Sequence, residues 1–421
     1  MRPIRTRRRT CGKRTALATT ERFIHPDSFT DGRHSVNATS VIAGALAIAV
    51  LTGNASAEPI RFATFNASMN RGGAGELAAA LRNGADPQIA GAAAIVRAVD
   101  PDVILINEFD YGAGLDRVFV ENWLDDAYPF SFIAPSNTGV ATGLDLDGDG
   151  IAGSEAGTIE LARDSHGFGM FEGQYGMLVL SRHEIAVEDV RTFRTFRWRD
   201  MPGARLPARP DGTPFYSDEA LDVLRLSSKS HWDVPVRIGG EVVHFLVSHP
   251  TPPVFDGPED RNGARNADEI RFWSDYVAGK EYIHDDSGRK GGLATGAHFV
   301  IAGDLNADPA DGESVPGAIG QLLDHPLIDA SVVPRSDGAA AAAATQRGAN
   351  SVHRGDPRFD TADFNDDPAP GNLRVDYVLP SAGLEVVAAG VFWPPEGAPE
   401  AAWLDASDHR PVWIDVTLPA R

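Results

Sequence analysis

Carboxylates, amides and imidazoles recur at the ends of short apolar runs along this chain of 421 residues. In the stretch HFVIAGDLNADP, the apolar residues 299–302 are followed by Gly303, Asp304, Leu305 and Asn306. Polar residues at other such ends are Asn66, Glu108, His249, Asp376, Asp408 and His409. Each alone is typical of a turn. Together they offer oxygen ligands that suit Mg²⁺ or Mn²⁺, and imidazoles that transfer protons or bind anions.

This inventory matches the needs of phosphoryl transfer. The reaction requires neutralised charge on the phosphate oxygens, an activated water and help for the leaving oxygen. Asp304 and Asn306 are two positions apart, so we expect both side chains to leave an extended segment on the same face. Asp408 and His409 are adjacent and cannot share a face, so we expect one at a metal ion and the other at a phosphate group.

The segments that must position these residues are predicted to be strands. Short apolar runs bounded by Gly, Pro and Asp predict buried strands at 60–68, 101–110, 176–182, 241–250, 298–304, 373–381 and 406–416. Helices are predicted at 88–100 and 266–279. Strands mixed with helices indicate a layered α/β domain.

Three segments dense in Gly, Pro, Asp and Arg separate these elements: 134–173, 194–230 and 331–371. Because strand patterns continue on either side of each segment, we interpret them as loop insertions on one domain.

The first 57 residues differ from the rest. A basic lead, the apolar stretch 41–51 and the sequence Ala55-Ser56-Ala57 predict a secretory signal peptide cut after Ala57. The lead is unusually long, so translation starting near Val36 is an alternative, and an N-terminal membrane anchor is another. A signal peptide implies a secreted protein, extracellular or periplasmic, with no stable membrane span in its mature form.

Export would leave a strongly acidic chain without thiols. The first 57 residues contain the only cysteine, Cys11, and carry a net charge of +6, so the remainder carries −27 against −21 for the whole chain. Strong negative charge disfavours nucleic acid as a partner without excluding it.

The ordered motifs TFN, INEFD, SHP, GDLNADP, RVDYVLPS and SDHRPV resemble the endonuclease/exonuclease/phosphatase superfamily of DNase I-like metal-dependent phosphoesterases, in a secreted bacterial-type form. The resemblance covers residues 60–417. It implies a four-layer sandwich of two packed mixed β-sheets flanked by helices, in a single domain at 58–421.

The resemblance also implies site roles. Glu108 would bind a divalent metal ion, Mg²⁺ or Mn²⁺, and Asn66 and Asp408 would help to hold the metal or its waters. Asp304 would orient or deprotonate the attacking water. Asn306 would hold a phosphate oxygen or the nucleophile.

Three further residues complete the implied site. His409, oriented by Asp376, would contact the scissile phosphate, and His249 would serve on the leaving side. In the DNase I branch the second histidine has an acidic partner, but near that place this chain offers Gln174 and Tyr175, with Glu172 slightly earlier. His249 is therefore interpreted either as a neutral phosphate ligand or as a structural residue.

A second cation site is indicated by the spacing D-x-D-x-D-G at Asp145, Asp147 and Asp149. The twelfth position of an EF-hand loop falls on Ala156, and Glu155 lies one short of it. We predict a loop stabilised by Ca²⁺, with a plain acidic turn as the alternative.

Candidates for gripping an anionic substrate lie in a basic segment. They are Arg191, Arg194, Arg197, Arg199, Arg205 and Arg209, interleaved with aromatic residues. The alternative is a solvated basic loop that offsets surrounding acids. His231, Arg261 and Arg265 are further candidates for lining the pocket.

The sequence therefore predicts a secreted divalent-metal-dependent phosphoesterase that hydrolyses P–O bonds of phosphate mono- or diesters by attack of water. The acidic charge favours phosphomonoesters or small and lipid-linked phosphodiesters, including compounds like inositol phosphates. The first alternative is an extracellular endonuclease, and the second is a non-enzymatic Ca²⁺-dependent binding module on the same fold.

Overall fold

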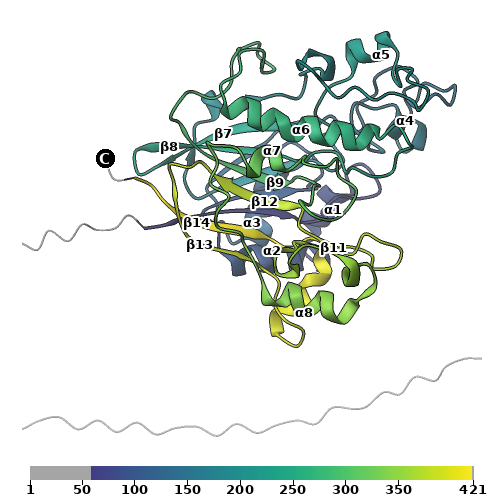
Figure 1. Cartoon of the computed structure of the whole chain (residues 1–421). Coiled ribbons are helices and arrows are strands. Elements are labelled where there is room, and N and C mark those ends of the chain that lie inside the picture. Colours follow the sequence, from purple (N-terminus) through teal and green to yellow (C-terminus); the bar gives the residue numbers. More distant parts are fainter. Residues whose placement is uncertain (1–57, 420–421) are drawn as a thin grey trace, which may run out of the picture. The chain divides into compact units, whose positions relative to one another are not determined.

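The computed structural model of the protein describes residues 58–419 (Figure 1). The predicted signal peptide, like the alternative anchor, falls at 1–57 and lies outside the described residues. Within 58–419, no helix combines the length and the apolar character needed to cross a bilayer. Two large β-sheets form the centre of this part of the chain.

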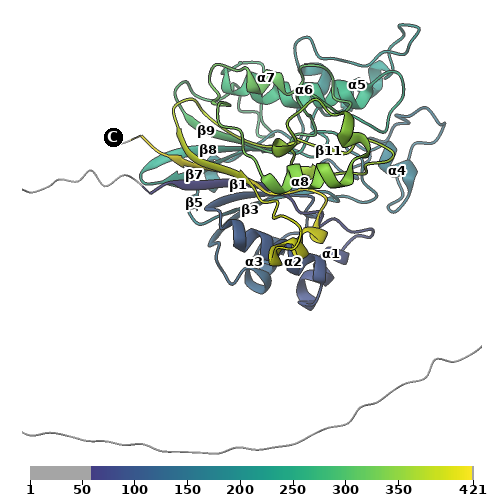
Figure 2. The same cartoon turned by 60° about the horizontal axis from the view of Figure 1, so that its bottom comes forward.

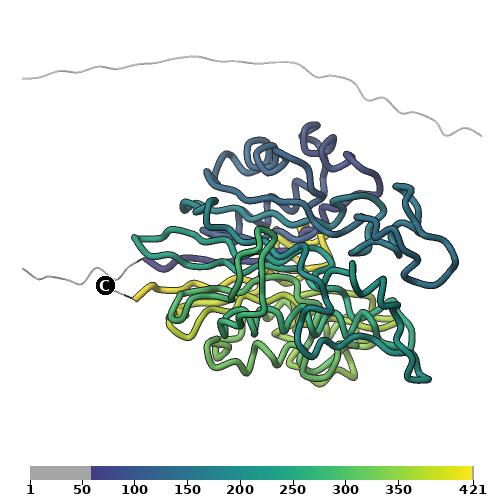
Figure 3. Tube along the Cα trace, turned by 90° about the horizontal axis from the view of Figure 1, so that it is seen from above, coloured from purple at the N-terminus to yellow at the C-terminus, as the bar shows by residue number. Residues whose placement is uncertain are grey.

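The first sheet has six strands and joins the two ends of the described chain. Its order is β13 (Glu385–Val391), β14 (Val412–Thr417), β1 (Ile60–Asn66), β2 (Val103–Asn107), β4 (Met177–Ser181) and β3 (Phe130–Ile133). Strand β1 pairs antiparallel with β14, so the purple and yellow parts of the tube run together in Figure 3. It pairs parallel with β2, and this places Asn66 opposite Asn107 at the same sheet edge.

The second sheet also has six strands. Its order is β12 (Asp376–Pro380), β9 (His298–Asp304), β8 (Glu241–Ser248), β7 (His231–Ile238) and β5 (Glu184–Ile185), with β6 (Arg191–Thr192) also paired to β7. Strands β8 and β9 are parallel, and β12 is antiparallel to β9 with Asp376 opposite Asp304. The short strands β10 (Ala362–Asp363) and β11 (Asn372–Leu373) pair with each other beside it.

The sheets pack face to face through apolar side chains that alternate along their strands. Phe62 of β1 and Phe245 of β8 lie in this middle layer with ring centroids 5.6 Å apart. The outer face of the first sheet packs against α1 (Glu76–Asn83), α2 (Pro87–Val99) and α3 (Leu115–Trp123). The outer face of the second packs against α6 (Arg261–Val277) and α7 (Gly320–Leu323), as Figure 2 shows. The predicted four-layer sandwich is confirmed.

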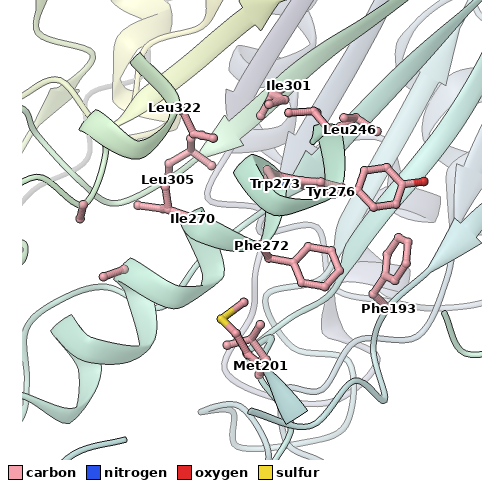
Figure 4. Close-up of a cluster of buried hydrophobic side chains, with 14 of the residues drawn as sticks. Phe193, Met201, Leu246, Ile270, Phe272, Trp273, Tyr276, Ile301, Leu305 and Leu322 are labelled. Atoms are coloured by element: carbon pink, nitrogen blue, oxygen red, sulfur yellow. The ribbon is translucent and has the colours of Figure 1, made fainter. Parts of the chain in front are cut away.

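Helix α6 is the main cover of the second sheet. Ile270 and Trp273 of α6 pack with Leu246 of β8 and Ile301 of β9, and Leu305 joins them from beyond the end of β9 (Figure 4). Because so much apolar surface is buried along this helix, its position relative to β8 and β9 is strongly constrained. The polar ends of these strands therefore have a rigid support.

The predicted strands and helices correspond to observed ones, but the predicted insertions contain more structure than loops. Segment 134–173 holds α4 (Ile159–Arg163), segment 194–230 holds α5 (Asp218–Val223), and the alanine run in 331–371 forms α8 (Asp337–Gln346). Short 3₁₀ helices are η1 (Val187–Asp189), η2 (Trp198–Asp200), η3 (Gly348–Val352), η4 (Pro357–Phe359) and η5 (Pro399–Ala406).

Gly303 permits the close approach of β8 and β9 just before Asp304. A Cβ atom at this position would lie 2.1 Å from the carbonyl oxygen of Ser248, which is far inside contact distance. Both strands are held by packing on their two faces, so neither can move away without loss of core contacts.

We expect Gly303→Ala to lower the free energy of unfolding by about 1–3 kcal/mol or more, because overpacking at a rigid site is destabilising. Denaturant titration of the purified variant measures this. Gly72→Ala is the matched control, since the nearest atom to its added Cβ is a side-chain oxygen of Glu76 at 4.0 Å. Equal stability of the two variants would contradict the argument.

Candidate active site

Two carboxylates, one from each sheet, meet at a single amide. Asn66, the last residue of β1, donates from Nδ2 to Oε1 of Glu108 at 3.1 Å and to Oδ2 of Asp304 at 3.0 Å. Glu108 follows β2 and has a left-handed backbone, with φ of 58°, so the chain turns sharply at the sheet edge. The predicted proximity of Asn66, Glu108 and Asp304 is therefore observed.

Two further asparagines support these carboxylates. Asn70 donates to the second oxygen of Glu108 at 2.7 Å. Asn107 is fully buried, and its Oδ1 accepts from the backbone N–H of Asp304 at 3.3 Å, which ties β2 of the first sheet to β9 of the second. The sequence analysis assigned no role to either residue: Asn107 stands in the motif INEFD beside Glu108, and Asn70 stands in no motif.

His409 is fixed by a buried carboxylate. Its Nδ1 lies 2.9 Å from Oδ2 of Asp376, and the hydroxyl of Thr361 donates to the same oxygen at 2.9 Å. The other ring nitrogen, Nε2, lies 3.6 Å from Oδ2 of Asp304. The predicted orientation of His409 by Asp376 is thus present, with Thr361 as an additional support.

His249 approaches the same oxygen from another direction. Its Nε2 lies 3.4 Å from Oδ2 of Asp304, whereas its Nδ1 is buried and has no hydrogen-bond partner among residues 58–419. Gln174 is engaged elsewhere, accepting from the backbone of Met170 and donating to the carbonyl of Arg71, and Glu172 is exposed. The acidic partner that the sequence comparison left in question is therefore absent from the described residues.

The two imidazoles differ in charge because their surroundings differ. Burial lowers the pKa of His409, but Asp376 and Asp304 more than offset this and raise it to about 10. Burial lowers the pKa of His249 well below its usual value, and the charges of Lys229 and His409 lower it further. At neutral pH, His409 is an imidazolium and His249 is a neutral imidazole.

Burial also raises the pKa of both carboxyl groups. The pKa of Asp304 is raised to about 6, with His409 opposing the rise, and that of Glu108 is raised in spite of the hydrogen bond from Asn66. No Lys or Arg side chain in the described part of the chain forms an ion pair with either group. A buried carboxylate, Asp304, and a half-buried one, Glu108, both without such a partner, fit a divalent cation such as Mg²⁺.

Asn306 lies in the site but not as predicted. The segment is not extended there: φ of Asn306 is 52°, and its backbone N–H donates to Oδ1 of Asp304 at 3.0 Å. Its side chain donates to the carbonyl of Pro250 at 3.1 Å. The expectation of a shared extended face was wrong because the chain turns immediately after β9, and the side-chain oxygen of Asp304 stabilises the turn.

Helix α6 holds the loops that carry these residues. Asn266 donates to the carbonyls of Thr251 at 2.8 Å and Leu305 at 2.9 Å. Glu269, fully buried, accepts from the backbone N–H groups of Ser228 and Thr251, both at 2.6 Å. These two residues are one helical turn apart and were not identified from sequence, since polar residues in an amphipathic helix usually face solvent.

Asp408 lies at the rim. Its side chain is exposed and accepts from the hydroxyl of Ser68 at 3.1 Å, and the backbone N–H of Ser68 donates to Asn66 at 3.2 Å. Asp408 is therefore linked to Asn66 through Ser68, and no direct hydrogen bond joins it to Glu108 in the described structure.

The three aspartates of the predicted Ca²⁺ loop, Asp145, Asp147 and Asp149, lie together on the surface. One carboxylate oxygen of each lies within 4.8 Å of the others. Asp145 accepts from the backbone of Gly148 at 2.7 Å and of Gly150 at 2.8 Å, which closes a tight loop. The geometry suits both predicted alternatives, a Ca²⁺ loop and an acidic turn.

Three of the six arginines in the basic segment are paired with carboxylates. Arg191 is buried against Asp285 at 2.7 Å, Arg197 pairs with Asp200 at 2.8 Å, and Arg199 pairs with Asp222 at 2.5 Å. These contacts fit the alternative of a basic loop offset by acids for these three arginines, and the buried Arg191 is not available to a substrate. Local acidic neighbours in the sequence could have indicated this for Arg197.

The three other candidates for lining the pocket have structural contacts. Both ring nitrogens of His231 are engaged, with Ser227 at 3.0 Å and the carbonyl of Glu269 at 2.9 Å. Arg265 is buried and donates to backbone carbonyls, and Arg261 pairs with Glu259. His231 and Arg265 therefore belong to the support of the site, and Arg261 is engaged with Glu259 and with the ring of Phe215.

Asp360 is an unusual carboxyl group behind His409. It is 7% exposed and precedes Thr361, and none of the described residues donates a hydrogen bond to its carboxyl group. Burial, together with the nearby acids Asp308, Asp311 and Asp356, raises its pKa to about 8. The folded state therefore binds this proton more tightly than the unfolded state, in which the pKa is about 3.8.

Because the folded state carries the extra proton, Asp360 reduces stability as the pH rises from about 4 to about 8. We expect Asp360→Asn, which cannot ionise, to gain stability over the wild type across this range, reaching on the order of 1–3 kcal/mol above pH 8. Thermal unfolding at pH 5, 7 and 8.5 measures the gap. The exposed Asp125→Asn is the control, and a gap that does not widen with pH would refute the assignment.

Comparison with known proteins was made against family models and solved structures. A family model described as "Endonuclease/Exonuclease/phosphatase family" matches residues 63–409. None of the curated proteins matches the chain.

Among solved structures, the chain is similar to an endonuclease/exonuclease/phosphatase from Beutenbergia cavernae DSM 12333, at 18% identity and a TM-score of 0.48, covering 86% of this chain and 72% of that one. It is also similar to sphingomyelinase C from Streptomyces griseocarneus, at 15% identity and a TM-score of 0.44, covering 85% and 99%. The match to the family model spans most of the chain, including the residues from Asn66 to His409 and every strand of the two sheets except β14 and the start of β1. The chain belongs to the endonuclease/exonuclease/phosphatase family and is a metal-dependent enzyme that hydrolyses phosphoric esters.

Proposed function

We propose that the protein is an exported phosphoesterase that cleaves P–O bonds of phosphomonoesters or of small and lipid-linked phosphodiesters by direct attack of water. The observation that carries the proposal is the convergence of Asn66, His249 and His409 on one oxygen of Asp304, at 3.0, 3.4 and 3.6 Å. Export rests on the basic and apolar pattern of residues 1–57 alone.

Glu108 would hold the divalent cation, with Asn66 beside it and Asp408 acting from the rim. The bound cation, Mg²⁺ or Mn²⁺, would neutralise charge on the phosphate oxygens and lower the pKa of a coordinated water. Asn70 and Asn66 orient the two oxygens of Glu108 toward the site. Proton transfer and contacts to the phosphate group would be carried out by side chains of the protein.

Asp304 would serve as the general base. A pKa of about 6 leaves its carboxylate ionised at neutral pH yet basic enough to take a proton from the attacking water. The backbone N–H of Asn306 fixes the other oxygen, Oδ1, at 3.0 Å, so Oδ2 is the oxygen that both histidines approach. Asn66 limits the rotation of this carboxylate.

The two histidines would have different roles. His409, held as an imidazolium by Asp376, would donate a hydrogen bond from Nε2 to a phosphate oxygen. Its positive charge would stabilise the negative charge that develops on that oxygen in the transition state. His249 is neutral and would act through Nε2 as a hydrogen-bond partner of the phosphate group or of the leaving oxygen.

Charge favours a small substrate over nucleic acid. Residues 58–421 carry a net charge of −27, and Arg191, Arg197 and Arg199 are already paired with carboxylates. A nuclease needs a basic surface that follows the phosphate backbone. The non-enzymatic binding module is not supported, because the chain belongs to a family of hydrolases and the site residues are intact.

We expect Asp304→Asn to lower kcat/KM for a hydrolysed ester by about 10²–10⁴-fold, because Asn keeps the shape but cannot accept the proton. EDTA should abolish wild-type hydrolysis, and Mg²⁺ or Mn²⁺ should restore it. The assay uses p-nitrophenyl phosphate, bis(p-nitrophenyl) phosphate, inositol phosphates, a phospholipid and plasmid DNA, with Asp125→Asn as control. Preferential cleavage of DNA would favour the endonuclease alternative, and no metal-dependent hydrolysis of any ester would refute the proposal.

We further propose that Asp145, Asp147 and Asp149 hold Ca²⁺ in a structural loop. Support comes from the three carboxylates, which lie within reach of one ion, and from the backbone N–H groups that fix Asp145. Exported proteins meet Ca²⁺ at concentrations that fill weak sites.

If Ca²⁺ fills this loop, it should stabilise the wild type by about 1.4 kcal/mol at ten times the dissociation constant. Thermal unfolding with CaCl₂ and with MgCl₂ measures the effect. Asp149→Asn should remove the response to Ca²⁺ and leave phosphoesterase activity with Mg²⁺ unchanged. The same response in wild type and variant would show that the loop is a plain acidic turn.

A further inference from the structure

The segment that precedes β7 carries a buried lysine, Lys229. Its side chain is 7% exposed, and it is followed by Ser230 and His231. Both nitrogens of His231 are engaged in hydrogen bonds, so the functional candidate in this segment is not the histidine. Lys229 differs from His231 because its ammonium group has little hydrogen bonding of its own.

Lys229 reaches the site from the side of His249 and Asn306. Its Nζ donates to the carbonyl oxygen of Pro250 at 3.5 Å, and the side-chain amide of Asn306 donates to the same oxygen at 3.1 Å. Pro250 directly follows His249. The ammonium group is therefore placed beside the turn that holds Asp304, within the same group of side chains.

The ammonium group lacks a direct anionic partner. No carboxylate oxygen of the described residues lies within ion-pair distance of its Nζ, and the carboxylate of Glu269 is occupied by the backbone N–H groups of Ser228 and Thr251. Burial lowers the pKa of Lys229, while Glu269, Glu108 and Asp304 partly oppose this. A buried ammonium with three N–H donors and one long hydrogen bond is costly unless another anion completes its contacts.

A phosphate oxygen is the anion that this position fits. The carboxylates of Glu108 and Asp304 are near enough to influence the charge of Lys229, and in the proposed function they serve the cation and the water. One N–H group of Lys229 is directed at the carbonyl of Pro250. The other two are available to donate to an oxygen of the phosphate group, next to the amide of Asn306.

We propose that Lys229 is a catalytic residue that binds a non-bridging oxygen of the substrate's phosphate group and stabilises the charge that develops there in the transition state. This inference rests on the proposed function. Lys229, which shares the Pro250 carbonyl with Asn306, and His409, which is held by Asp376, would then both supply positive charge to the phosphate group.

The test replaces Lys229 by Met, which keeps the length of the side chain and removes the charge. Two readouts are used. The first is kcat/KM with Mg²⁺ on the ester that the wild type hydrolyses with the highest kcat/KM, and the second is the rise in melting temperature caused by inorganic phosphate with Mg²⁺. Lys280→Met is the matched control because Lys280 is exposed. Lys229→Gln is a second variant with a polar replacement.

We expect Lys229→Met to lower kcat/KM by about 10²–10³-fold and to lose most of the stabilisation by phosphate. Its melting temperature without phosphate should equal or exceed that of the wild type, because a buried unpaired charge has been removed. Lys280→Met should match the wild type in every readout. Activity within threefold of the wild type, or unchanged stabilisation by phosphate, would overturn the proposal.

If both Lys229 variants melt at a lower temperature without phosphate, or if both fail to fold, the charged side chain of Lys229 stabilises the fold. That result would also overturn the proposal. The two hypotheses can fail separately. If the wild type hydrolyses no ester, the proposed function is wrong, whereas the phosphate-binding readout still decides whether Lys229 binds this anion.

Discussion

The Asn66 amide that bridges Glu108 and Asp304 joins the two sheets at the point where the chemistry would occur. Two carboxylates delivered by different sheets repel each other and resist burial. One N–H group directed at each, together with the link from Asn107 to the backbone of Asp304, holds them in place. The site therefore depends on the register of β1 and β2 in one sheet and on the packing of that sheet against β9 in the other.

The same geometry also gives His409 and His249 different charges at neutral pH. His409 has Asp376 behind it, so its proton is retained. The Nδ1 atom of His249 has no partner within 58–419, and burial together with the charges of Lys229 and His409 lowers the pKa of its ring. Two histidine side chains thus approach Oδ2 of Asp304, one positively charged and the other neutral. The arrangement provides a fixed positive charge and a neutral hydrogen-bond partner without any change of pH.

The sequence predicted the strand ends because an apolar run followed by a polar residue is a local pattern, as at Asp304 and Glu108. Which ends meet followed from the resemblance, since spatial order cannot be derived from spacing alone. Asn306 was misplaced because its left-handed backbone is not encoded in the apolar pattern. Asn266 and Glu269 were missed because they serve backbone groups far away in the chain, and such partners leave no local signal.

The insertions contribute to the site instead of merely surrounding it. Asn137, fully buried in the segment 134–173, donates from its backbone to the carbonyl of Lys229 at 2.8 Å and from its side chain to the carbonyl of Ser227 at 2.8 Å. On the other side, Glu269 of α6 holds the backbone of Ser228. The segment that carries Lys229 is thus fixed between an insertion and a core helix. Strand ends supply the chemistry, and insertions position the groups around the substrate, so substrate choice can change through the insertions while the carboxylates stay in place.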